Sequence, residues 1–241
     1  MNKINAFVIP ATGLCLAVGI AVAGFFVSQT LYNVKAALNT AEVKGLAERR
    51  VEADRANWTL VFRVAGAKRS DVPQLYARSE RDRERIIGVL KENGFGDDEI
   101  RPGVIDYGYM EFRDDDQKLV DEKHQLTGSI DVETDKVDLV ARTRSKINRL
   151  IAEGIDIENR PPRYFFTGLN DIKPDMLKEA TQNARIAANE FAENAGVHVG
   201  RIRSARQGGF IVRDAGEEYG DTEKIDKDVR VVTTITFYLS D

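Results

Sequence analysis

Hydrophobic positions change their spacing several times along the chain, and each change predicts a different element. Residues 6–27 form an uncharged run rich in Val, Ala, Ile, Leu and Phe. A helix rises about 1.5 Å per residue, so this run can cross a hydrocarbon layer of about 30 Å. It predicts a transmembrane helix over residues 1–30, with these membrane-facing side chains: Phe7, Leu14, Leu16, Val18, Ile20, Phe25 and Phe26.

A cleaved secretory signal peptide is the alternative interpretation of this segment. Ala21-Val22-Ala23 has the small residues of a cleavage site. The apolar run nevertheless continues to Val27 and exceeds the roughly 7 to 15 residues of a signal-peptide core. We therefore expect a retained anchor. Lys3 precedes the run and Lys35 follows it, so charge alone leaves its orientation nearly undecided.

Small residues recur at every fourth position inside the apolar run. Gly13, Ala17 and Ala21 would share one narrow helix face, which is typical of close helix–helix contacts in membranes. Gly and Ala are also common in membrane helices that make no such contact. The three residues are thus a candidate contact, and the general abundance of small residues is the alternative.

The pattern after the apolar run changes from helix to strand. Leu31, Val34 and Leu38 have helical spacing, which predicts a helical stalk over residues 31–41 that breaks near Gly45. Residues 58–64 then alternate between large apolar and other side chains. This alternation predicts a strand with one strongly apolar face.

A repeated order of elements follows. A helical pattern over residues 70–93 and a second over 135–153 each end at a glycine and lead through an acidic turn to an aromatic strand. The dipeptides Arg101-Pro102 and Arg160-Pro161 occupy equivalent places. This repeat predicts duplicated β-α-β units on an antiparallel or mixed sheet. We expect an α+β domain over residues 42–241.

The last part of the chain predicts one helix and two strands. The helix follows Pro174, and its expected inward face contains several alanines together with Phe191. Strands are expected over residues 197–206 and 229–239. The final strand has two faces that both suit burial, which predicts a central strand or an oligomer contact. Its candidate contact residues are Val229, Val231, Ile235, Phe237 and Leu239.

Composition limits the chemistry. The chain has 35 Lys and Arg against 39 Asp and Glu, a net charge of −4, so we expect no nucleic-acid partner. One Cys and two His leave few candidates for a metal centre or a nucleophile. Neither His124 nor His198 has a catalytic partner at diagnostic spacing, and no phosphate-binding glycine loop follows a strand. We predict no catalytic residue, no cofactor and no metal.

Aromatic residues offer one alternative function. Tyr107, Tyr109, Tyr164, Phe165 and Phe166 lie in two predicted strands. If they are exposed, they indicate a module that binds a peptide, a lipid or an envelope protein. If they are buried, they are core residues. A hydrolase is the less favoured alternative.

Three segments carry a family resemblance: Leu-Lys-Glu-Asn-Gly before residues 98–101, the Ala-rich stretch 184–200, and Val-Val-Thr-Thr-Ile-Thr-Phe at 231–237. With them the chain resembles the SIMPL-domain family of YggE-like and periplasmic immunogenic proteins. The resemblance implies an α+β fold, export to the cell envelope, homo-oligomers and no known catalytic residues. We therefore expect a single-pass inner-membrane protein with its large domain in the periplasm, or a periplasmic protein cleaved near Ala23. It would be a self-associating structural or stress-related envelope protein, not an enzyme.

Overall fold

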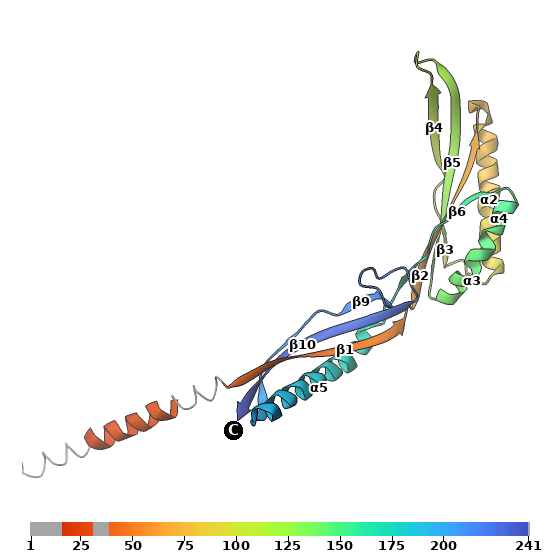
Figure 1. Cartoon of the computed structure of the whole chain (residues 1–241). Helices are drawn as coiled ribbons and strands as arrows, with labels where there is room; N and C mark the ends of the chain where they lie inside the picture. The colour runs from red at the N-terminus through yellow and green to blue at the C-terminus, as the bar shows by residue number, and fades with distance from the viewer. Residues whose placement is uncertain (1–15, 31–38, 241) are drawn as a thin grey trace, which may run out of the picture. The chain divides into compact units, whose positions relative to one another are not determined.

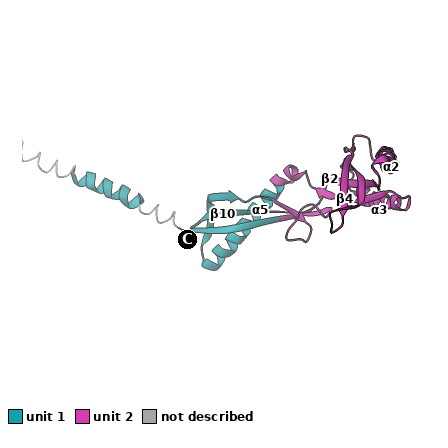
Figure 2. Cartoon of the chain, turned by 90° about the horizontal axis from the view of Figure 1, so that it is seen from above, with its two compact units in different colours: residues 1–47, 175–210, 231–241 teal, residues 48–174, 211–230 magenta. Residues whose placement is uncertain are grey.

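The computed structural model describes residues 16–30 and 39–240 (Figure 1). The chain divides into two compact units. Unit 1 comprises residues 1–47, 175–210 and 231–241, and unit 2 comprises residues 48–174 and 211–230 (Figure 2). Mixed helices and antiparallel sheets confirm the predicted α+β class.

Unit 2 contains a sheet of six strands. Its order is β3-β5-β2-β6, with β4 added to β5 and β7 added to β2. The strands are β2 (Arg55–Gly66), β3 (Ile100–Pro102), β4 (Asp106–Arg113), β5 (Leu119–Thr134), β6 (Asp156–Asn159) and β7 (Arg163–Phe165). Because β2 and β3 both run antiparallel to β5, they are parallel to each other with β5 inserted between them. This is a split β-α-β arrangement.

The helices of unit 2 follow the repeated order seen in the sequence. Helix α2 (Val72–Glu92) connects β2 to β3, and helices α3 (Val137–Ile147) and α4 (Arg149–Ala152) connect β5 to β6. A short 3₁₀ turn, Arg69–Asp71, precedes α2. Gly94 and Gly154, which follow α2 and α4, have φ values of 104° and 88°. Such left-handed residues end helices, and glycine adopts them without strain.

Large apolar side chains at every second position of β2 form the centre of the core of unit 2. Trp58, Leu60 and Phe62 share one face and are at most 1% exposed. Apolar side chains of α2, α3 and α4 join them in one buried cluster, and these helices cover one face of the sheet (Figure 1). The Trp58 indole N–H donates to Asn159 Oδ1 at 3.0 Å. The strand predicted over residues 58–64 is therefore present with its apolar face inward.

The sheet of unit 1 has the strand order β1-β10-β8. These strands are β1 (Thr40–Glu52), β10 (Asp226–Ser240) and β8 (His198–Gln207). A further strand, β9 (Ile211–Asp214), pairs with the first residues of β10, which belong to unit 2. Positions 39, 42 and 45 contact positions 239, 236 and 233, so β1 and β10 run antiparallel. The stalk prediction is wrong for residues 40 and 41, which belong to β1. Residues 31–38 lie outside the described part of the chain.

Helix α5 (Leu169–Ala195) packs on the unit 1 sheet through very small side chains. Ala184 and Ala188 form a buried cluster with Val43, Ile235 and Phe237. A Cβ atom at Gly45 would lie 1.8 Å from the Ala180 carbonyl oxygen, so glycine permits this approach of helix and strand.

The inward face of α5 differs from the sequence prediction at one large residue. Its buried positions recur every four residues, at Met176, Ala180, Ala184, Ala188 and Ala192. Phe191 lies outside this stripe and is 66% exposed. The predicted alanine face is thus confirmed, and the assignment of Phe191 to it is wrong.

Candidate functional site

The predicted anchor lies partly within the described residues. Phe7, Gly13 and Leu14 are outside them. Residues 16–30 are helical, and all of their side chains are exposed, including those of Ala17 and Ala21. The seven large apolar side chains of this helix have these exposed fractions: Leu16 65%, Val18 55%, Ile20 65%, Val22 50%, Phe25 65%, Phe26 62% and Val27 60%. Among residues 16–30 and 39–240, no helix has both the length and the apolarity needed to span a membrane.

The candidate oligomer strand, β10, packs within the fold of its own chain. Val229, Val231, Ile235 and Phe237 are at most 1% exposed, and Leu239 is half-buried. Strand β10 lies between β1 and β8, so its backbone has neighbours on both sides. The side chains of these residues are core residues, and a contact between copies through them stays a prediction.

The five candidate aromatic residues separate into two groups. Tyr107 and Tyr109 on β4 are 51% and 45% exposed, whereas Tyr164 on β7 is only 7% exposed. Phe165 and Phe166 are half-buried. Of the five, only Tyr107 and Tyr109 on β4 therefore form an exposed aromatic surface. Both rings lie against His124, the one buried histidine of the described chain.

His124 lies on β5 between these two tyrosines and is 1% exposed. The Tyr107 hydroxyl lies 2.7 Å from His124 Nδ1. The Tyr109 ring stacks on the imidazole with 4.9 Å between ring centroids, and the two residues are direct partners across the strands. Pairing at the base of a hairpin thus holds the imidazole between two phenol rings.

The other imidazole nitrogen faces a carboxylate. His124 Nε2 is buried and lies 3.4 Å from Glu122 Oε1 without hydrogen-bond geometry. When the Tyr107 hydroxyl donates to Nδ1, the Nε2 atom of the neutral imidazole carries the hydrogen. The cluster therefore places a phenol and a carboxylate next to the two ring nitrogens, and only the phenol is hydrogen-bonded.

Carboxylates also determine the protonation of Tyr109. The Tyr109 hydroxyl donates to Glu111 Oε1 at 2.8 Å, and this hydrogen bond raises the pKa of Tyr109 to about 12. The Arg113 guanidinium and the Tyr109 hydroxyl together lower the pKa of Glu111. Tyr109 thus stays a neutral hydrogen-bond donor through the physiological pH range.

Beyond His124 the two strands continue as a two-stranded ribbon, which we call the β4–β5 ribbon (residues 109–124). Residues 119–123 of β5 pair only with β4, since β2 pairing ends at His124. The turn is closed by the Asp114 carboxylate, which accepts from the amides of Asp116 and Lys118. These two hydrogen bonds hold the turn at the three adjacent aspartates, residues 114–116.

The outer part of the ribbon carries exposed apolar side chains on a free strand edge. All eight residues of β4 are exposed, and within the described part of the chain its only sheet neighbour is β5. The large apolar side chains have these exposed fractions: Met110 45%, Phe112 49%, Leu119 45% and Val120 67%. Sequence reasoning missed them. Counting outward from the turn places Tyr109 opposite Lys123, and a register shift between Phe112 and Arg113 moves it to His124.

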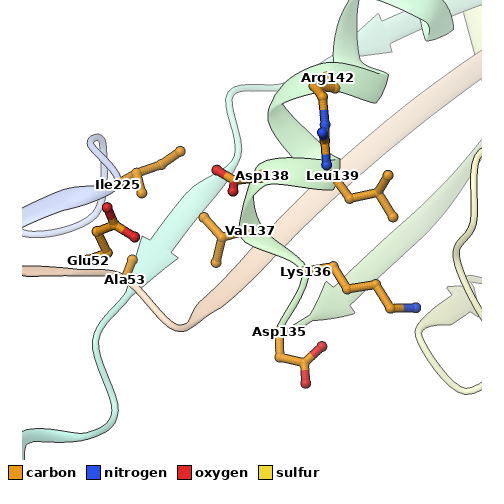
Figure 3. Close-up of a pocket in the computed structure, with 9 residues that line it drawn as sticks. All are labelled: Glu52, Ala53, Asp135, Lys136, Val137, Asp138, Leu139, Arg142 and Ile225. Carbon is orange, nitrogen blue, oxygen red and sulfur yellow. The ribbon is translucent and has the colours of Figure 1, made fainter.

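Unit 2 also has a hollow of about 450 Å³ at the start of α3 (Figure 3). Ala53, Val137, Leu139 and Ile225 give it an apolar wall. Its charged residues are exposed, and one of them, Lys136, forms an ion pair with Glu99 at 2.7 Å. The charged groups point in different directions (Figure 3), so the hollow defines no particular ligand.

A second hollow, of about 470 Å³, lies on the sheet of unit 2 near the Arg160–Pro161 turn. Three arginines line it, and two of them are paired with carboxylates: Arg101 with Glu133 at 3.1 Å and Arg160 with Glu158 at 2.9 Å. Arg163 lies over the Phe165 ring. These contacts already give the three arginines partners within the chain, so the hollow indicates no anionic ligand.

A comparison with protein-family models decides the family. Residues 41–237 match the SIMPL family model, whose description is a protein of unknown function (DUF541). The chain belongs to the SIMPL family. This confirms the resemblance seen in the sequence. No curated protein matches the chain. The family is one of unknown function and is not a known enzyme family, so the SIMPL domain brings no catalytic assignment to the His124 cluster.

Proposed function

We propose that this SIMPL protein is a membrane-tethered envelope protein whose large domain lies in the periplasm and self-associates. The observation that carries the tether is the helix at residues 16–30. Every side chain in it is exposed, including seven large apolar ones. An apolar helix that meets no part of its own described chain favours a non-aqueous surrounding. A retained anchor provides one.

The ribbon supports self-association. An isolated two-stranded hairpin is marginally stable in water, and a free edge strand is a template for another chain. Exposed Met110 and Phe112 add apolar area to this edge. The occupant that we propose for it is the β4 edge of a second copy, because tethering raises the local concentration of identical domains.

The sequence of β4 is self-complementary in an antiparallel pairing. If two copies pair about Met110, Phe112 of one lies opposite Gly108 of the other, and Arg113 lies opposite Tyr107. An aromatic side chain over a strand glycine and an arginine over a phenol are both favourable. Tyr109 would then lie opposite Glu111, the residue type it already binds within one chain.

The tether is tested by deleting residues 1–30. We expect the full chain to require detergent and the shortened chain to be released as a folded soluble protein. Protease added to intact spheroplasts should digest the domain of the full chain. A mature protein that begins after Ala23, or a domain that resists protease until the inner membrane is opened, would contradict the proposal.

Self-association is tested by native mass in mild detergent. Phe112→Glu places a charge at the proposed contact and should reduce the mass to that of one chain. Phe191→Glu is the matched control, since Phe191 is also a well exposed phenylalanine but lies on α5. An unchanged oligomer in the Phe112 variant would exclude the β4 edge.

The same edge supports a second candidate function, a module that binds peptides by adding a strand. Exposed Tyr107 and Tyr109 favour it, because aromatic side chains beside a free strand edge are typical of such sites. The native mass distinguishes the two functions. A single-chain mass for the unaltered protein, together with a co-purifying peptide, would favour the peptide-binding module.

A further inference from the structure

The edge strand β8 carries a group of arginines without ion-pair partners. Arg201, Arg203 and Arg206 are exposed, and none has a carboxylate within 4 Å among residues 16–30 and 39–240. Within the described residues, β10 is the only sheet neighbour of their strand. Three exposed arginines within six residues make a local positive surface, which attracts an anionic partner.

The neighbouring strand cannot supply that partner. Residues 231–240 of β10 contain no charged side chain. Thr234 lies directly opposite Arg206, and the Ser204 hydroxyl bonds that of Thr236 at 3.1 Å. In the unit 1 part of this sheet, the described carboxylate lies on β1, on the far side of β10, and no carboxylate of the described chain is within 4 Å of the three arginines.

The beginning of β8 lies beside the point where the chain arrives from the apolar segment. His198 pairs with Ser240, and the Leu239 amide, one residue away, donates to the Asn39 carbonyl at 2.8 Å. Only residues 28–38 separate Asn39 from the apolar run, a stretch that spans at most about 40 Å when fully extended. A membrane that holds the run is thus within reach of β8.

We propose that the β8 edge binds the phosphate groups of anionic lipids in the membrane that holds the anchor. The proposal rests on the tether proposed above. Guanidinium groups bind phosphate through paired hydrogen bonds, and clusters of basic residues beside a membrane segment are typical of contacts with anionic lipids. The contact would fix the domain at the membrane surface in a defined orientation.

The full chain in lipid nanodiscs tests this proposal. One set of discs contains phosphatidylcholine alone and the other contains phosphatidylcholine with phosphatidylglycerol, and hydrogen exchange of the amides of residues 198–207 is followed by mass spectrometry. We expect exchange in the anionic discs to be slower by about tenfold or more at low salt. The difference should shrink at 0.5 M NaCl because salt screens the contact.

Two variants with the same change of charge make the test specific. Arg201→Gln, Arg203→Gln and Arg206→Gln together should remove the lipid-dependent slowing. Arg69→Gln, Arg81→Gln and Arg142→Gln together remove three exposed arginines of unit 2 that have no carboxylate within 4 Å in the described chain, and they should leave it intact.

The possible failures are distinguishable. A chain that does not enter nanodiscs overturns both the tether and the lipid contact. A chain that enters them but shows the same β8 exchange in both lipids overturns only the contact. Slowing that depends on the number of chains per disc and not on lipid charge also overturns it. That result would assign β8 to an acidic segment of a second copy, such as residues 217–223.

Discussion

The Lys227 ammonium donates a hydrogen bond of 2.5 Å to Asp214 Oδ1, and the two side chains are only 0% and 3% exposed. Asp214 also accepts from the amides of Glu223 and Lys224, and Lys227 donates to the Asp221 carbonyl. This buried pair therefore fixes the whole connection between β9 and β10.

Breaking this pair should be strongly destabilising. Lys227→Met leaves a buried carboxylate without its cation, and we expect the free energy of unfolding to fall by about 3–5 kcal/mol. Urea unfolding of the full chain in detergent measures it. Lys91→Met is the control, because Lys91 forms an exposed pair with Asp97 and should lose less than about 1 kcal/mol. Similar losses in both variants would contradict the prediction.

Glycine substitutions should have opposite signs at two positions. Gly45→Ala forces a methyl group into the Ala180 carbonyl, so α5 must move, and we expect a loss of about 1–3 kcal/mol. Gly88 lies inside α2, and a Cβ there meets nothing within 4 Å. Gly88→Ala should stabilise the protein by about 0.5–1 kcal/mol. Thermal unfolding of both variants is the measurement, and a neutral Gly45→Ala would show that α5 does not approach β1 so closely.

Removing the Tyr107 hydroxyl should affect the His124 cluster more than removing that of Tyr109. Tyr107→Phe leaves the buried Nδ1 atom of His124 unpaired, at a cost of about 1–3 kcal/mol. Tyr109→Phe removes exposed hydrogen bonds to Glu111 and Glu122 and should cost less than about 1 kcal/mol. Urea unfolding compares the variants. In the unaltered protein, ¹⁵N NMR should report the Nε2–H tautomer of His124, and an Nδ1–H tautomer would refute this arrangement.

Glu99 should make stability depend on acid pH. Burial opposes its ionisation, yet hydrogen bonds from the Gly96 amide, Lys136 and Thr134 lower its pKa overall. A carboxylate whose pKa is lowered by folding stabilises the protein fully above its unfolded pKa of about 4.3, and this contribution is lost as pH falls through the folded pKa.

Comparison of Glu99→Gln with the unaltered chain tests this dependence. We expect the variant to be less stable at pH 7 by about 1–3 kcal/mol, and the difference should shrink toward pH 3. Glu84→Gln, at an exposed position of α2, should show no such convergence. A constant difference from pH 7 to pH 3 would exclude Glu99 as the titrating group.

Local patterns in the sequence predicted much of unit 2. The alternation from Trp58 to Val64 and the glycines at 94 and 154 predicted the correct elements, because strand faces and helix ends depend on neighbouring residues. Strand β1 was missed because its inward positions are small, with Gly45 and Ala47 giving no strong alternation. These residues are small because α5 packs closely against them in the folded chain, and the sequence alone does not show this contact.

Long-range contacts explain what the sequence could not provide. A lysine such as Lys227 is ordinarily exposed, and nothing near it in the sequence indicates that Asp214 and the Asp221 carbonyl enclose it. The sequence could not predict the His124 cluster, because the register shift between Phe112 and Arg113 changes which residues of the hairpin lie opposite each other. The role of β10 needed the sheet order, because a strand with two coverable faces suits both a central position and an interface.

Strand β5 is 16 residues long and continuous. Its second half lies in the core of unit 2, and its first half forms one side of the ribbon. The strand is unbroken between the two halves, so a pull or a twist applied at the ribbon tip would travel along one backbone to Ile130 and Val132. A partner that binds the tip of the β4–β5 ribbon is thereby mechanically connected to the core of unit 2.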